Sequence, residues 1–293
     1  MSMTVSEKDH IIAFQPVLST LSGVVILQFF SYWTDRINRS SKPRLISVMC
    51  ATAFGLHMLQ LLSEVWILFN SATSTRKDYC ACYQYGAFGT YFTLSIALIV
   101  QFHFSRITFI LIDYSKAWIV LTCLLALITT ISGFGTAMSF TVKYALYLRN
   151  DLIKPRVFSR VVVGLYLSWL ASAVISNLSI LVILGVSIKF QRRRGVQKKL
   201  RDVFERLRIL TLSALALNAF AALLSMICVA ISHLFPHIDI NIRLRLQSVS
   251  FIVVSFSSRL YLISFLWSLS PFHITPSPDF GSCVAPLPSQ LSG

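Results

Sequence analysis

The chain alternates between long apolar segments and short polar ones. Seven of the apolar segments reach the roughly 20 residues that a helix needs to cross a bilayer core of about 30 Å. They span residues 11–33, 45–69, 87–111, 117–139, 161–188, 209–231 and 246–270. Lipid offers no hydrogen-bonding partner to an open strand, so each segment is expected to be helical. The pattern predicts an all-α fold, an integral membrane bundle of seven transmembrane helices.

Both ends of the chain are expected to be tails. Residues 1–10 form a short N-terminal tail, residues 11–270 the transmembrane domain and residues 271–293 a C-terminal tail. The first span has no basic leader and no small-residue cleavage site, which favours a retained helix over a signal peptide. The last 23 residues hold five prolines and one acidic residue, a composition typical of disorder. We see no internal repeat of the kind common in secondary transporters.

Composition supports a membrane protein. Of the 293 residues, 55% are hydrophobic and 13% are charged, against about 25% charged in a soluble domain, so an ordinary soluble protein is excluded. The net charge of +15 raises the question of a nucleic-acid partner. The basic residues lie in the gaps between apolar segments, however, and this argues against nucleic acid. Six scattered cysteines fit neither a disulfide framework nor a zinc module.

Lysine and arginine in the loops indicate the orientation. With the N-terminus outside, the inner loops hold 15 of these residues and the outer loops hold 10. Inner loops are normally the more basic, so the count favours an outside or lumenal N-terminus and a cytosolic C-terminus. The glycosylation sequon at Asn38 would then lie unused in the cytosol.

Several short motifs occur in a fixed order along the spans. They are Gln28 and Tyr32 in the first span, His57 in the second, residues 102–106 in the third, residues 133–137 in the fourth, Trp169 and Leu170 in the fifth, and Leu260, Tyr261 and Ser264 in the seventh. In these motifs and their spacing, over most of residues 16–270, the chain resembles a large fungal, mainly basidiomycete, family of seven-helix membrane proteins of unknown function. The resemblance implies a receptor-like shape and supplies no substrate.

The chain departs from that family where relatives tend to carry aspartate. Phe54 stands at one such position, three residues before His57, and Asn177 stands at another in the fifth span. The asparagine usual in the seventh span is Ile263 here. The resemblance therefore implies a divergent member, in which any function of those carboxylates is lost or altered.

Better-known classes of seven-helix protein fit the chain poorly. A retinal protein needs a lysine in its last helix and span 246–270 has none, nor does it have the Asn-Pro-x-x-Tyr run of G-protein-coupled receptors. A zinc hydrolase needs three ligands that converge at one depth. His233 and His237 fall in an expected loop, and His57 and His103 lie at different depths on different helices. We therefore expect no metal, no cofactor and no enzymatic activity.

A few polar residues lie inside the spans, where burial in lipid is costly and polar side chains usually face the bundle. Counted at about 1.5 Å per residue, five of them fall near the membrane midplane. The candidate ligand-binding residues are His57, Gln60, Glu64, Gln101, Asn177, Asn218 and Arg259. Two interpretations stay open for this layer: hydrogen bonds that hold the helices together, or the lining of a ligand cavity or ion path.

Arg259 favours keeping the second interpretation. On the same rise of about 1.5 Å per residue, Glu64 lies about 12 Å above it, so no acid is expected at its level. We expect its guanidinium to face the bundle interior and to meet water, an anionic ligand, or carbonyl and amide groups. The partners expected within the layer are His57, Asn177 and Asn218.

The gap between the fifth and sixth spans is the most basic part of the chain. Its nine cations orient the protein, and residues 191–208 also carry apolar positions at near-helical spacing. That pattern suits an amphipathic helix lying on anionic lipid, within the loop 189–208. The residues expected at the membrane surface are Arg192, Arg193, Arg194, Lys198, Lys199 and Arg201. A cytosolic partner such as a G protein is a third interpretation.

These features predict a receptor-like, non-enzymatic membrane protein with a small-molecule site at the midplane layer. The alternative is a secondary transporter or proton-coupled carrier that uses His57, Glu64 and Arg259. A carrier needs a charged or titratable pair that is reachable from both faces, whereas a receptor needs a cavity open on one side.

Overall fold

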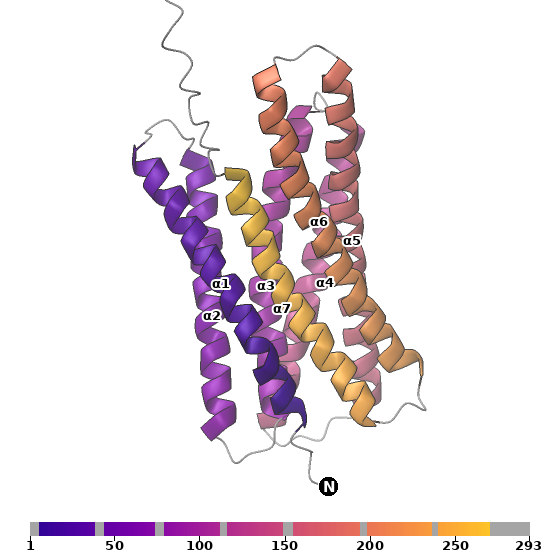
Figure 1. Cartoon of the computed structure of the whole chain (residues 1–293). Helices are drawn as coiled ribbons and strands as arrows, with labels where there is room; N and C mark the ends of the chain where they lie inside the picture. Colours follow the sequence, from indigo (N-terminus) through magenta and orange to yellow (C-terminus); the bar gives the residue numbers. More distant parts are fainter. Residues whose placement is uncertain are drawn as a thin grey trace, which may run out of the picture.

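The computed structural model describes residues 6–38, 44–73, 79–111, 116–148, 155–193, 198–235 and 240–269. These residues form seven helices and no strand, which confirms the predicted all-α fold. The helices are α1 (Ser6–Asn38), α2 (Arg44–Thr73), α3 (Tyr79–Leu111), α4 (Lys116–Leu148), α5 (Pro155–Arg193), α6 (Lys198–Leu234) and α7 (Ile240–Leu269). Figure 1 shows them as one elongated bundle of roughly aligned rods.

Each helix contains a stretch apolar and long enough to cross a membrane, so the seven predicted spans are confirmed. The helices are longer than the spans, at 30 to 39 residues, or about 45 to 58 Å at 1.5 Å per residue. Helix α1 begins at Ser6, so residues 6–10 are helix rather than the expected tail. A helix gains one hydrogen bond per added residue, and this allows it to continue beyond the apolar core. The predicted tail 271–293 lies outside the described residues.

The basic segment between the fifth and sixth spans is mostly helical. Helix α5 continues to Arg193, and α6 runs without a break from Lys198 into the sixth span. The segment 198–208 is therefore helical, as predicted, but it is one piece with a spanning helix. Arg194 lies outside the described residues, and so do the side chains of the other five residues expected at the membrane surface.

Helix α7 is the central helix of the bundle. In the most apolar stretch of each helix, 72% of the α7 residues are buried, against 17% of the α1 residues and 22% of the α4 residues. Helix α7 packs against α6, α1 and α3, and it crosses the bundle between α1 and α6 in Figure 1. Helix α2 packs mainly on α3 and α1 mainly on α7. Six polar residues in the apolar part of α7 are accordingly buried in the interior: Ser250, Ser255, Ser257, Ser258, Arg259 and Ser264.

Two buried apolar clusters hold the helices together. The first contains residues of α1, α2, α3 and α7 together with Ile180 of α5 and Leu215 of α6. The second surrounds Tyr166 and Trp169 of α5 and contains residues of all five helices from α3 through α7. Gly133 of α4 lies against the second cluster. A Cβ atom there would meet Leu94 Cδ1 at 2.7 Å and Trp169 Cδ1 at 3.2 Å, so the small residue permits close packing of α4.

Candidate functional site

All seven candidate ligand-binding residues are buried. None of them is more than 5% exposed, and His57, Gln60, Asn177 and Arg259 are 0% exposed. Polar side chains in a membrane bundle face the interior because lipid cannot satisfy them. The structure divides these residues between two clusters, one around Arg259 and one around Tyr261, both of which lie on α7.

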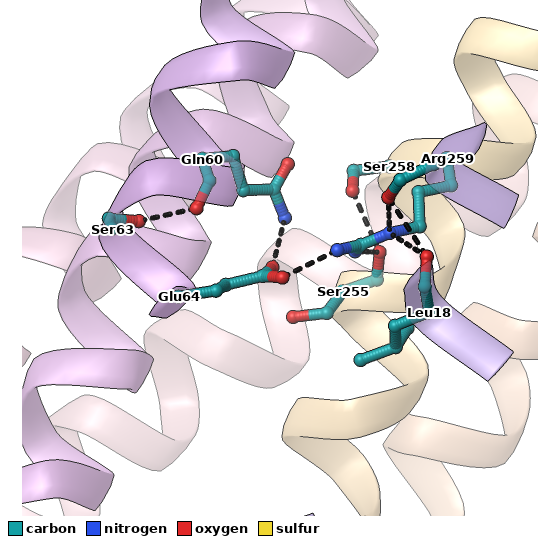
Figure 2. Close-up of polar contacts among 8 residues, drawn as sticks. Leu18, Gln60, Ser63, Glu64, Ser255, Ser258 and Arg259 are labelled. Carbon is teal, nitrogen blue, oxygen red and sulfur yellow. Dashed lines mark hydrogen bonds and ion pairs between the residues drawn. The ribbon is translucent and has the colours of Figure 1, made fainter. Parts of the chain in front are cut away.

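The first group, here called the Arg259 cluster, joins α1, α2 and α7. It consists of Arg259, Glu64, Gln60, Ser22, Ser255 and the carbonyl of Leu18. Arg259 Nη2 donates to Glu64 Oε2 at 2.5 Å, and Nη1 donates to the Ser255 carbonyl at 2.8 Å. Arg259 Nε donates to the Leu18 carbonyl at 3.1 Å and to Ser22 Oγ at 2.9 Å. Figure 2 shows Glu64 and Arg259 pointing toward each other from α2 and α7. One guanidinium thus links three helices.

The ion pair between Glu64 and Arg259 corrects the expectation that no acid lies at the level of Arg259. The two side chains are 2% and 0% exposed. Depth counted from assumed helix ends placed Glu64 too far away, because that count ignores helix tilt and the reach of two long side chains. Arginine in a helix also extends toward the N-terminus of its own helix. Here it reaches the Ser255 carbonyl one turn earlier, and so approaches Glu64.

Gln60 and His57 extend the polar face of α2 from the ion pair. Gln60 Nε2 donates to Glu64 Oε1 at 3.1 Å, so each carboxylate oxygen accepts one bond (Figure 2). Gln60 Oε1 and both ring nitrogens of His57 have no hydrogen-bond partner among the described residues. His57 also lies within electrostatic range of Arg259. This face of α2 therefore carries buried hydrogen-bonding capacity beside a charged pair.

The second group, here called the amide cluster, consists of Gln101, Asn177, Asn218 and Tyr261. Asn177 Nδ2 donates to Tyr261 Oη at 2.6 Å, which joins α5 to α7, and the side chain of Gln101 on α3 also bonds to this hydroxyl. Asn177 Oδ1, Gln101 Nε2 and both polar atoms of Asn218 are buried without a partner in the described part of the chain.

Asn218 is assigned to this cluster because its register places it at a depth similar to that of Asn177. Asn177 lies one turn before Ile180, and Asn218 lies one turn after Leu215, while Ile180 and Leu215 share one buried core. Helices α5 and α6 pack together as successive antiparallel spans, so both amides lie one turn toward the same end of the bundle. Neither amide is among the hydrogen-bond partners described for Arg259, which corrects that part of the prediction.

A third set of polar residues was missed by the sequence interpretation and is well satisfied. The Tyr166 hydroxyl lies 3.1 Å from Ser225 Oγ and 2.9 Å from Ser250 Oγ, and the two serines also bond to each other. Thr129 donates to Ser172 Oγ at 2.9 Å between α4 and α5. These bonds connect neighbouring helices, as expected of interhelical hydrogen bonds. Serine and threonine are too common in spans to stand out from sequence.

Ser22, Ser255 and Tyr261 were also missed. Ser255 has a readable signal, since it lies four residues before Arg259 on the same helix face. Ser22 has no such signal, and Tyr261 stood out only as a motif residue, because their partners Arg259 and Asn177 are distant in the sequence.

Among the described residues, no group of three His, Cys, Asp or Glu side chains could hold a metal ion. His103 lies 3.1 Å from Ser268 Oγ and packs edge-on against Phe265. His237 lies outside the described residues. What the clusters offer is therefore hydrogen bonding and charge: a fixed ion pair, and, without partners among the described residues, the two ring nitrogens of a histidine and at least one polar atom on each of four amide side chains.

Comparisons of the chain with known protein families, with characterised proteins and with solved structures found no match.

Proposed function

We propose that the protein is a receptor-like, non-enzymatic seven-helix membrane protein that binds a small polar molecule inside its bundle. One observation carries this proposal: the amide cluster keeps buried hydrogen-bonding atoms without a partner in the described residues, on Gln101, Asn177 and Asn218. Buried polar groups are normally paired, and an unpaired one costs about 1–3 kcal/mol. A ligand with hydroxyl or amide groups would satisfy them.

The ligand expected at the amide cluster is uncharged. Its free atoms include amide donors, Gln101 Nε2 and Asn218 Nδ2, and amide acceptors, Asn177 Oδ1 and Asn218 Oδ1. Amides offer hydrogen bonds but no net charge to balance an ion. A neutral molecule that both donates and accepts, such as an alcohol or an amide, matches this set.

Asn218→Leu tests the proposal. Removing an unsatisfied buried amide should raise the free energy of unfolding by about 1–3 kcal/mol, and removing a ligand contact should abolish the stabilisation that a ligand gives the wild-type protein. The measurement is thermal unfolding of the purified full chain, with and without each member of a panel of neutral alcohols and amides. If no member stabilises the wild-type protein, or if the variant keeps the full stabilisation, the proposed site is wrong.

Ser225→Ala is the matched control. Ser225 is equally buried on the same helix, but it is satisfied by Tyr166 and Ser250. The substitution should lower stability by about 1 kcal/mol, the typical value of a hydrogen bond. It should leave stabilisation by the ligand unchanged.

A second candidate function is a proton-coupled carrier, and the Arg259 cluster favours it. Glu64 and Arg259 form a charged pair buried in the spanning region, with His57 on the same face of α2. Ionisable residues inside a membrane commonly mark substrate, ion or proton paths. The ion pair joins two of the three residues that a carrier would use, and His57 lies two turns from Glu64 on the same helix.

We also propose an outside or lumenal N-terminus, from the loop charges. A reporter fused after Gly293 should then be cytosolic, and one inserted after Ser74 should be outside or lumenal. Protease protection of the two reporters in sealed vesicles measures this. Glycosylation at native Asn38 would reverse the assignment.

Three other expectations from the sequence stay predictions. They are contact of residues 189–208 with anionic lipid, coupling to a G protein and membership of the fungal family.

A further inference from the structure

The Arg259 cluster is balanced in charge before any ligand binds. Arg259 contributes one positive charge and Glu64 one negative charge, and a neutral imidazole on His57 adds none. Any ligand that brought a net charge into this site would leave that charge uncompensated among apolar helices, which is costly. The contents of the site should therefore be neutral overall.

Hydrogen-bonding capacity remains in the same place. The guanidinium of Arg259 carries one hydrogen on Nε and two on each Nη nitrogen. The hydrogen bonds to the described residues use one hydrogen on each of the three nitrogens, so one N–H on Nη1 and one on Nη2 remain for a ligand. His57 has two ring nitrogens and Gln60 has one carbonyl oxygen without a partner in the described residues. Gln60 lies three residues after His57 and four before Glu64, so these groups share one face of α2.

We propose that the Arg259 cluster binds a monocarboxylate together with one proton, which His57 holds. The inference rests on the second candidate function, the carrier, and names its substrate class as a weak acid. The carboxylate accepts hydrogen bonds from the remaining N–H groups of Arg259. The protonated His57 supplies the balancing charge, and the Gln60 carbonyl oxygen, which lies one turn away on α2 and has no partner among the described residues, is available to accept its second N–H.

The proton transfer balances within the site. A carboxylic acid that enters as the neutral molecule gives its proton to a ring nitrogen of His57. The O–H bond of the acid breaks and an N–H bond forms on the imidazole, which leaves a carboxylate beside an imidazolium. Release reverses the transfer. The Glu64–Arg259 pair keeps its charges throughout, so the total charge of the site does not change.

In the described part of the chain, the ionisable groups around His57 are as follows. Glu64 lies two turns away on α2, and Arg259 on α7 is the cation whose field reaches His57. Helix α1 contributes a carbonyl and a hydroxyl to the cluster. On α3, which packs against α2, His103 bonds to Ser268 and interacts with Arg106.

The test measures proton uptake on binding. The purified full chain is titrated calorimetrically with sodium lactate and with sodium benzoate, each in two buffers of different ionisation enthalpy. We expect one proton to be taken up per monocarboxylate bound. His57→Gln keeps a hydrogen-bonding side chain that cannot hold the proton. It should abolish proton uptake and weaken binding by about tenfold or more, the loss expected for a charge-assisted hydrogen bond.

His103→Gln is the matched control, because His103 is also buried but belongs to another contact. It should keep both proton uptake and affinity, and thermal unfolding verifies that both variants are folded. Binding without proton uptake, proton uptake that survives in His57→Gln, or no binding of either acid would overturn the inference.

Flux separates the inference from the carrier function. In vesicles with the reconstituted protein, lactate should enter down a proton gradient and should not respond to a membrane potential, because the load is neutral. Lactate entry that is driven by the membrane potential would overturn the inference of a neutral load, but it would still support a carrier function. Proton-linked binding without flux would support the site and overturn the carrier.

Discussion

Replacing Arg259 with leucine will lower the free energy of unfolding by about 3–5 kcal/mol, because Glu64 then keeps a buried charge without its partner. A domain is typically held folded by about 5–15 kcal/mol, so this loss is a large share of the total. The links from Arg259 to the Leu18 carbonyl and Ser22 on α1 disappear with it. Chemical unfolding in detergent and the yield of monodisperse protein on gel filtration measure the effect.

The double variant Arg259→Leu/Glu64→Leu should recover most of that loss. Replacing both members of a buried ion pair by apolar residues is often neutral or stabilising, whereas removing one member is not. Arg106→Leu is the control, since Arg106 is exposed on α3 and its loss should change stability by no more than about 0.5 kcal/mol. If the double variant is no more stable than Arg259→Leu, the ion pair does not explain the cost.

Gly133→Val will destabilise the bundle by about 1–3 kcal/mol, the range for an overpacked core. A Cβ atom at Gly133 would lie 2.7 and 2.9 Å from the two methyl carbons of Leu94 and 3.2 Å from Trp169 Cδ1. The first two distances are shorter than contacts between carbon atoms allow, and the branches of valine add further atoms. The buried Leu94 side chain would therefore have to change its rotamer, or α4 would have to move away from α3 and α5. Thermal unfolding of the purified protein measures the loss.

Gly164→Val is the same substitution at a glycine with open space around it. No atom lies within 4 Å of a Cβ built there. Replacing glycine in a helix removes a penalty of up to about 1 kcal/mol, so this variant should be as stable as the wild type or slightly more stable. Equal losses at Gly133 and Gly164 would mean that the close packing of α4 is not the cause.

The number and type of elements could be read from the sequence, because the bilayer imposes them. A span needs about 20 apolar residues and must satisfy its own amide groups, and only a helix does both. The seven predicted spans appear as α1 to α7 for this local reason. Burial of the seven candidate residues follows from the same constraint, since a polar side chain within a span is driven to face other helices.

The partners of those residues were decided by the tertiary structure. Depth counting placed Glu64 and Arg259 apart, whereas helix packing brings their side chains to 2.5 Å. The same packing pairs Asn177 with Tyr261. It gives Arg259 hydrogen-bond partners on α1, α2 and α7.

The physical reason is that hydropathy fixes a residue's depth only approximately and says nothing of helix tilt, rotation or neighbour. Those three quantities depend on how side chains such as Leu94, Trp169 and Gly133 fit between helices. The sequence by itself thus determined that the chain forms seven membrane helices and that the polar candidate residues within them are buried. Only their packing decided that α7 lies at the centre, with a guanidinium that ties α1 and α2 to it.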